Sequence, residues 1–290
     1  MTNASNLARI IGALALALAL SACSAVKLGY NTLGEVAYWW LDGYVDLTES
    51  QAPRVREDLG RLHLWHRGTE LPRVADLLQN MEKLVAADIV PAQACVFVTE
   101  LRERLGAVMT QAEPAMVTLA ISLEPDQLAH LERKYRRNNA DYRKEWVELP
   151  PAEQREKRFK QVLERSEMVY GKLEEPQRAA LRQQMERSVF DPARILAERQ
   201  RRQQDLVQTL RKLAGQPIAL AQARQLMHDY LERAQDSPDA AYRRYQEALI
   251  EESCRMFSVA HNSTTAAQRE IAARRLRAYQ RDVRELAAQR

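Results

Sequence analysis

The chain has 290 residues, of which 28% are charged and 46% hydrophobic, and its formal net charge is +4. Its nine glycines are far fewer than sheet-rich folds use, which argues against a fold of that class. Charged residues of both signs are typical of solvated helix faces, and they do not by themselves indicate nucleic-acid binding.

Residues 1–22 have the pattern of a bacterial signal peptide. Arg9 supplies a positive charge, an apolar run extends from Ile10 to Leu20, and small residues follow. This run of eleven residues is too short to span a bilayer, which needs about 20. The segment from Leu20 to Cys23 (LSAC) resembles the lipobox of bacterial lipoproteins, in which a lipid is attached to the cysteine. In the alternative reading, Cys23 is an ordinary small residue at a signal cleavage site.

The lipobox resemblance implies a mature chain that begins at Cys23 and carries a diacylglyceryl group and an amide-linked acyl chain such as palmitate. Ser24 follows the cysteine where an aspartate would retain the protein in the inner membrane, so the sorting rule for such lipoproteins indicates the outer membrane. We therefore expect a Gram-negative protein that faces the periplasm, where nucleic acid is not a partner. The expected partners are the membrane, through the lipid, and another protein of the envelope.

Aromatic residues gather directly after the anchor. Residues 24–29 span at most about 20 Å when extended, so we expect Tyr38, Trp39, Trp40 and Tyr44 near the lipid headgroups, where amphipathic rings are favoured. The same four rings are also suited to the core of the domain. The sequence leaves both interpretations open.

The rest of the chain repeats apolar residues at steps of three and four, as in Val74, Leu77, Met81 and Leu84. This spacing predicts an all-α protein of about eight to ten helices, carried on an N-terminal lipid anchor. Prolines mark the breaks, and each is expected near the first turn of a helix, where its missing N–H costs nothing. The expected organisation is a signal peptide at 1–22, a lipidated tether at 23–30 and a helical domain at 31–290, with an internal boundary near residue 150.

A short motif, Leu-x-x-x-Gln, recurs along the chain. It occurs at Leu47 to Gln51, Leu123 to Gln127 and Leu173 to Gln177, with a degenerate copy at Thr264 to Gln268. In the first copy, Thr48 can cap the backbone while Gln51 reaches back, which is a capping box at a helix start. The motif also resembles the L-T-x-x-Q helix starts of Spy-type periplasmic chaperones.

Few residues suggest chemistry. His63, His66 and Glu70 have spacing that places three metal ligands on one helix face, but His66 also lies on an apolar stripe and no second histidine cluster completes a site. We therefore expect no metal, and a packed, hydrogen-bonded His66 beside Trp65. No nucleophile elbow or glycine-rich phosphate loop occurs, so we expect neither an enzyme nor a cofactor.

The segment from Glu198 to Asp205 is polar on every face of a helix. Such a segment is either an exposed turn or a surface that binds a charged partner. Arg199 and Arg202, one turn apart, are the residues that would make this contact.

Cys95 and Cys254 are the two cysteines that remain when Cys23 carries the lipid. Both lie in apolar helical segments, and the periplasm oxidises thiols. The sequence leaves open whether they form a disulfide or stay two separate buried thiols.

Several segments together resemble an uncharacterised lipoprotein family of Gram-negative bacteria, known as a domain of unknown function. They are the lipobox Cys23, Tyr30 and Asn31, Trp39 to Thr48, Gln51, Trp65 and His66, Glu70 to Pro72, and Glu198 to Gln203. This resemblance implies a place in the envelope and no established activity. We expect a non-enzymatic helical scaffold or binding module tethered to the outer membrane, and the alternative is a periplasmic chaperone or folding factor for exported proteins.

Overall fold

The computed structural model describes residues 26–215 and 217–289. The predicted signal peptide and the predicted lipidation site Cys23 lie outside these residues. Within them the chain is all-α, with eleven α-helices and no strand, which confirms the predicted fold class. The helices are α2 (Leu33–Val45), α3 (Ala52–Trp65), α4 (Leu71–Leu84), α5 (Pro91–Ile121), α6 (Pro125–Tyr142), α7 (Pro151–Tyr170), α8 (Glu175–Glu186), α9 (Pro192–Ala214), α10 (Leu220–Gln235), α11 (Ala240–Asn262) and α12 (Ala266–Ala288).

Two short π-helical turns, η1 (His66–Glu70) and η2 (Arg143–Val147), continue α3 and α6. The turn η1 joins α3 to α4 without a break, and Pro72 explains its wider winding. A proline ring clashes with the carbonyl four residues earlier and cannot donate to it. At η1 the N–H of Leu71 instead donates to the carbonyl of His66, five residues back.

Prolines stand in the first turn of α3 through α9, as the sequence predicts. The prediction is wrong for Pro114, which lies inside α5. The helix continues past this proline because Val117 and Ala120, one and two turns later, are buried in the core and hold its last turns in place. Tertiary packing here outweighs the local cost of the missing hydrogen bond.

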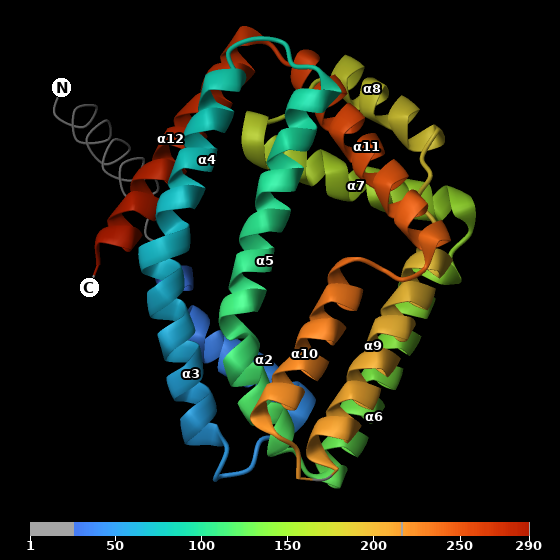
Figure 1. Cartoon of the computed structure of the whole chain (residues 1–290). Helices are drawn as coiled ribbons and strands as arrows, with labels where there is room; N and C mark the ends of the chain where they lie inside the picture. The colour runs from blue at the N-terminus through green and yellow to red at the C-terminus, as the bar shows by residue number, and fades with distance from the viewer. Residues whose placement is uncertain (1–25, 216, 290) are drawn as a thin grey trace, which may run out of the picture.

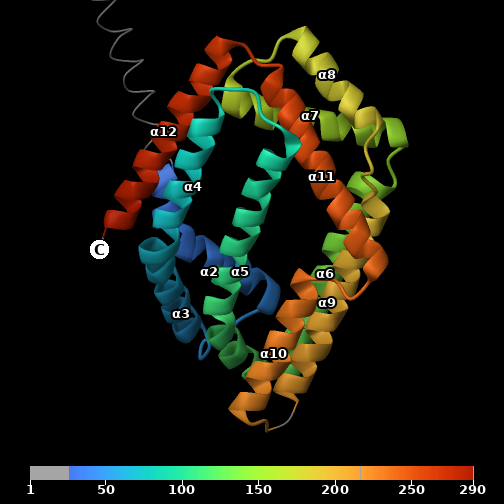
Figure 2. The same cartoon turned by 45° about the horizontal axis from the view of Figure 1, so that its top comes forward.

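The helices form an elongated frame (Figure 1). One long side is made by α4 and α12, which run side by side, and the opposite side by α6 and α9, while α5 crosses between them and packs on α10 and α11. Figure 2 shows the same arrangement from a tilted direction, with α7 and α8 gathered against α11 at one end. A helix break precedes α7 at Pro151, where the sequence places an internal boundary, and the boundary itself stays a prediction.

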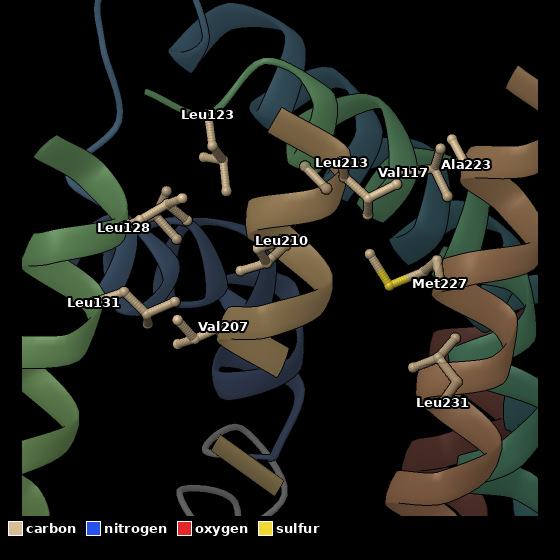
Figure 3. Packing of buried hydrophobic residues seen from close by; sticks show 12 residues of the cluster. Val117, Leu123, Leu128, Leu131, Val207, Leu210, Leu213, Ala223, Met227 and Leu231 are labelled. Carbon is tan, nitrogen blue, oxygen red and sulfur yellow. The ribbon is translucent and has the colours of Figure 1, made fainter. Parts of the chain in front are cut away.

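The core is divided into separate clusters. The largest gathers residues from α2, α5, α6, α9 and α10, including Val117, Leu131, Leu213 and Met227. Figure 3 shows Leu210 and Leu213 of α9 between the side chains of α6 and those of α10. A second cluster, built by α7, α8, α11 and α12, surrounds Tyr170 and Leu181.

The Leu-x-x-x-Gln motifs meet in two pairs. Gln51 and Gln127 exchange side-chain hydrogen bonds of 3.2 and 2.8 Å, and Gln177 and Gln268 exchange bonds of 2.7 and 3.1 Å. All four side chains are buried. We call these the glutamine pairs.

Each glutamine of a pair also forms hydrogen bonds with the backbone of its own helix start and with the backbone next to the partner motif. Its Oε1 accepts the N–H of the residue three positions earlier, which caps its own helix. Its Nε2 donates to a backbone carbonyl next to the partner motif; these carbonyls belong to Ser122, Asp46, Ser263 and Lys172. Every glutamine therefore starts one helix and fastens it to another helix start, through a carbonyl 71 to 96 positions away in the chain.

Two details differ from the sequence prediction. The Thr48 hydroxyl pairs with the Ser50 hydroxyl, so in this motif only Gln51 contributes the capping bond. The degenerate copy has the complete capping box, because Thr265 accepts the N–H of Gln268. A further helix start, Ile89 to Gln93, has the same form with isoleucine in place of the leucine; there Asn262 binds both backbone groups of Ile89 at 2.9 Å.

We expect the substitution Gln177→Leu to lower the free energy of unfolding by about 3 kcal/mol, because it leaves buried partners of the amide without hydrogen bonds. Gln93→Leu is the matched control. Gln93 caps its helix through Val90, but its Nε2 has no partner among the described residues, so its loss should cost only about 1 kcal/mol. Urea unfolding of both variants measures the difference, and equal losses would show that the pairing contributes nothing.

The structure joins Cys95 of α5 to Cys254 of α11 as a disulfide, with Cα atoms 5.4 Å apart. The bond lies in a small apolar cluster with Ile89 and Ala94. It connects residues 159 positions apart and so ties the central helix α5 to the second half of the chain.

Candidate functional site

The aromatic residues of α2 divide between core and surface. Tyr38 is buried, with 6% of its surface exposed, and the guanidinium of Arg56 lies 3.7 Å from its ring centre. Tyr44 is half-buried and accepts a hydrogen bond from Asn138. Trp39 and Trp40, by contrast, are each 64% exposed. The core interpretation therefore holds for Tyr38, whereas Trp39 and Trp40 lie on the surface, and contact of these two rings with lipid stays a prediction.

The exposed rings belong to an apolar face of α2. Leu33, Val36 and Trp40 follow at steps of three and four, so they share one side of the helix, and Trp39 borders them. All four side chains are exposed, and Leu28 of the preceding turn is exposed as well. We call Leu33, Val36, Trp39 and Trp40 the α2 apolar face. Contiguous exposed apolar side chains are uncommon on soluble domains and mark contact sites.

The chain just before α2 is attached to the body of the protein. Residues 26–31, part of which we expected to be an extended tether, are helical. Lys27 forms ion pairs with Asp282, at 3.5 Å, and with Glu285 on α12. The Asn31 amide oxygen accepts a 2.7 Å hydrogen bond from Arg67. The first described residues are thus held against α12 and the turn η1.

Tyr30 leads into a cluster of polar residues at the turn η1. Its hydroxyl lies 3.0 Å from Nδ1 of His66, and its ring packs edge-on against His63. Burial lowers the pKa of both histidines, and the charge of Arg67 adds to this effect at His63. Both rings are therefore neutral at physiological pH and serve packing and hydrogen bonding. Trp65 is half-buried beside them.

Glu70 ends the same turn and is fully buried. Its carboxylate binds Arg73 at 3.1 Å and lies 3.7 Å from Arg104 of α5. The charge is thus shared between two guanidinium groups. Among the residues that the structure describes, no three histidine, cysteine, aspartate or glutamate side chains are placed to hold a metal ion.

The burial of Glu198 shows that the segment 198–205 is not exposed on all sides, as its polar sequence suggested. Only 5% of its surface is exposed. Its carboxylate accepts hydrogen bonds from Arg201, at 2.9 Å through both oxygens, from Arg202 at 2.8 Å and from the Ser237 hydroxyl. Burial raises the pKa of Glu198, but these bonds outweigh burial and hold its pKa below the ordinary value. The sequence cannot show this, because Ser237 comes from the loop before α11.

Arg199 and Arg202 line a cavity of about 230 Å³ beside this ion cluster. Three tyrosines complete the wall, one each from α6, α10 and α11: Tyr135, Tyr230 and Tyr242. Ile195, Glu198 and Gln203 of α9 form the remainder. The sequence indicated the two arginines but not the tyrosines, because the tyrosines lie on three other helices.

No helix in the described part of the chain is long and apolar enough to cross a membrane.

The chain matches the model of DUF6279, a family of unknown function, over residues 43–231. No curated protein and no solved structure matches it. The matched range contains the pair Gln51 and Gln127 and most of the Arg199 cavity, and it ends before Cys254 and Gln268. Because this range covers more than half of the sequence, the chain belongs to the family of unknown function DUF6279.

Proposed function

We propose that this protein is a non-enzymatic lipoprotein of the cell envelope: a helical scaffold or binding module that the lipid on Cys23 holds at the outer membrane, facing the periplasm. The observation that supports this most is the α2 apolar face, which lies close after the lipobox. An anchored protein has a reason to expose apolar rings at this point that a freely diffusing one lacks.

The short distance from anchor to body strengthens the argument. Cys23 precedes the first described residue, Val26, by three positions, and Lys27 is already paired with α12. The acyl chains would therefore hold α2 close to the lipid headgroups. Tryptophan is enriched at that depth, and fully burying a large apolar side chain contributes roughly 1.5 to 3 kcal/mol.

The alternative, a periplasmic chaperone, has one supporting observation. Leu101 and Leu105, one turn apart on α5, are both exposed. Against it, the glutamines of the Leu-x-x-x-Gln motifs are buried in pairs and cannot bind a client. Under this alternative the protein would delay aggregation of an unfolded client, and Leu101→Ser with Leu105→Ser would abolish the delay. A client that aggregates equally fast with and without the protein would reject this alternative.

Tryptophan fluorescence tests the membrane contact. We expect lipids brominated in the upper acyl chain to quench part of the fluorescence of the full-length protein reconstituted into vesicles, because Trp39 and Trp40 would lie within contact distance of them. The variant Trp39→Phe with Trp40→Phe should lose most of the quenchable fraction.

Trp146→Phe is the control. This tryptophan packs against Phe190 with ring centres 5.4 Å apart, at η2, far from α2 in the chain. Its replacement should leave the amount of fluorescence that the brominated lipids quench unchanged. Quenching that survives the double substitution would show that the α2 apolar face does not touch the lipid.

A further inference from the structure

The cavity beside Arg199 is rich in hydrogen-bond donors that have no partner. Among the described residues, the hydroxyls of Tyr135, Tyr230 and Tyr242 make no hydrogen bond. Burial raises the pKa of Tyr135 and Tyr230, so both keep their protons at physiological pH and can donate. The three tyrosines that line this one space thus come from three different helices and carry hydroxyls that can donate.

Arg199 adds a positive charge that the rest of the site does not neutralise. Its guanidinium lies 5.7 Å from the ring centre of Tyr142 and has no carboxylate within ion-pair distance among the described residues. Arg202 uses Nε to bind Glu198, and its two terminal nitrogens are not engaged there. Both arginines therefore offer planar groups of donors to a ligand.

The acceptors around the cavity are already occupied. Both oxygens of Glu198 accept from Arg201, and one each from Arg202 and Ser237. Oε1 of Gln203 accepts a 2.7 Å bond from Asn139. The guanidinium groups can only donate and the tyrosine hydroxyls can donate as well, so this space favours a ligand rich in acceptors.

The charge of the surroundings has the matching sign. The charged residues that line the cavity are Arg199, Arg202 and Glu198, which gives its wall a net charge of +1. Arg233 binds Asp205 at 2.8 Å, so Asp205 does not offset Arg199. The site favours an anion.

We propose that this cavity binds the phosphoryl group of a small phosphate ester, with Arg199 as its main charged partner. Three tyrosine hydroxyls and two guanidinium groups supply more donors than the two oxygens of a carboxylate can accept, whereas a phosphoryl group offers three or four oxygens. The volume of about 230 Å³ is below the 300 to 1,000 Å³ of ordinary ligand pockets, which suits one headgroup-sized ligand. Such a group can come from a soluble phosphate monoester or from the phosphodiester of a lipid headgroup.

Calorimetric titration of the full-length protein in detergent tests the proposal with four probes: inorganic phosphate, glycerol 3-phosphate, glycerophosphoglycerol and acetate. We expect at least one phosphate compound to bind at least tenfold more tightly than acetate. Tighter binding of glycerol 3-phosphate identifies the soluble source, and tighter binding of glycerophosphoglycerol identifies the lipid headgroup. Equal affinity for acetate, or no binding by any phosphate compound, overturns the proposal.

Two variants locate the binding. Arg199→Gln should weaken phosphate binding at least tenfold, and Tyr230→Phe with Tyr242→Phe should weaken it several-fold without changing the net charge. Arg224→Gln is the matched control, because Arg224 is exposed on α10 and outside the cavity. This variant should bind phosphate as tightly as the unmodified protein does. Circular dichroism confirms that each variant is folded. Unchanged affinity in both the Arg199 and the tyrosine variants overturns the assignment to this cavity.

Discussion

Replacing Cys95 and Cys254 together with alanine is expected to lower the free energy of unfolding by about 5 kcal/mol. The disulfide closes a loop whose ends are 159 positions apart, and the chain-entropy model gives this value for a loop of that length. For a domain of this size such a loss corresponds to a decrease in melting temperature of roughly 10 to 20 °C. Thermal unfolding followed by circular dichroism measures it.

Reductant provides the control for this prediction. Dithiothreitol should destabilise the unmodified protein by a similar amount and leave the alanine variant unchanged. Alkylation of the denatured protein should detect both thiols only after reduction. Equal thiol counts with and without reductant would mean that no bridge forms in the cell, and the stability loss should then be no larger than that of other small core substitutions.

Replacing Cys23 with alanine is expected to abolish lipid attachment and to move the protein from the membrane fraction to the soluble fraction. One acyl chain gives marginal, reversible membrane binding, whereas several hold a protein stably. The four side chains of the α2 apolar face, exposed on one helix, should not replace them. Metabolic labelling with a fatty acid, followed by fractionation, measures both effects.

Ser24 supplies the control for sorting. Ser24→Ala should keep the label and the outer-membrane location, whereas Ser24→Asp should keep the label and shift the protein to the inner membrane. A fatty-acid label that persists in Cys23→Ala would refute the lipobox interpretation. If Cys23→Ala loses the label but lipids still quench Trp39 and Trp40, the contact of α2 with the membrane does not depend on the lipid anchor.

The helical class and the helix starts could be predicted from the sequence, because both depend on neighbours close in the chain. Apolar spacing of three and four defines a buried stripe on any helix, whatever packs against it. A glutamine three residues after a helix N-cap reaches its own backbone, as Gln127 and Gln177 do. Pro114 marks the limit of such local rules, because the burial of Val117 and Ala120 keeps α5 intact beyond it.

The α2 rings show why burial could not be assigned from the sequence. Residues 36–41 place apolar side chains around most of the helix, so periodicity cannot select an inward side. The contacts of α2 with α3 and α6 decide it, by burying Tyr38 and Val45 and leaving Trp39 and Trp40 exposed. Glu198 is the converse case, a charged residue that is buried because arginines and Ser237 surround it.

The sequence by itself determined the signal and lipobox pattern, the all-α class and the positions of the four motif glutamines. Only the tertiary structure decided which glutamines pair, that Cys95 lies 5.4 Å from Cys254, and that tyrosines from α6, α10 and α11 meet Arg199. Local sequence patterns predict the capping hydrogen bonds and the apolar face of a single helix. Pairings between residues 64 to 159 positions apart depend on how whole helices pack, and no single segment of the chain contains that information.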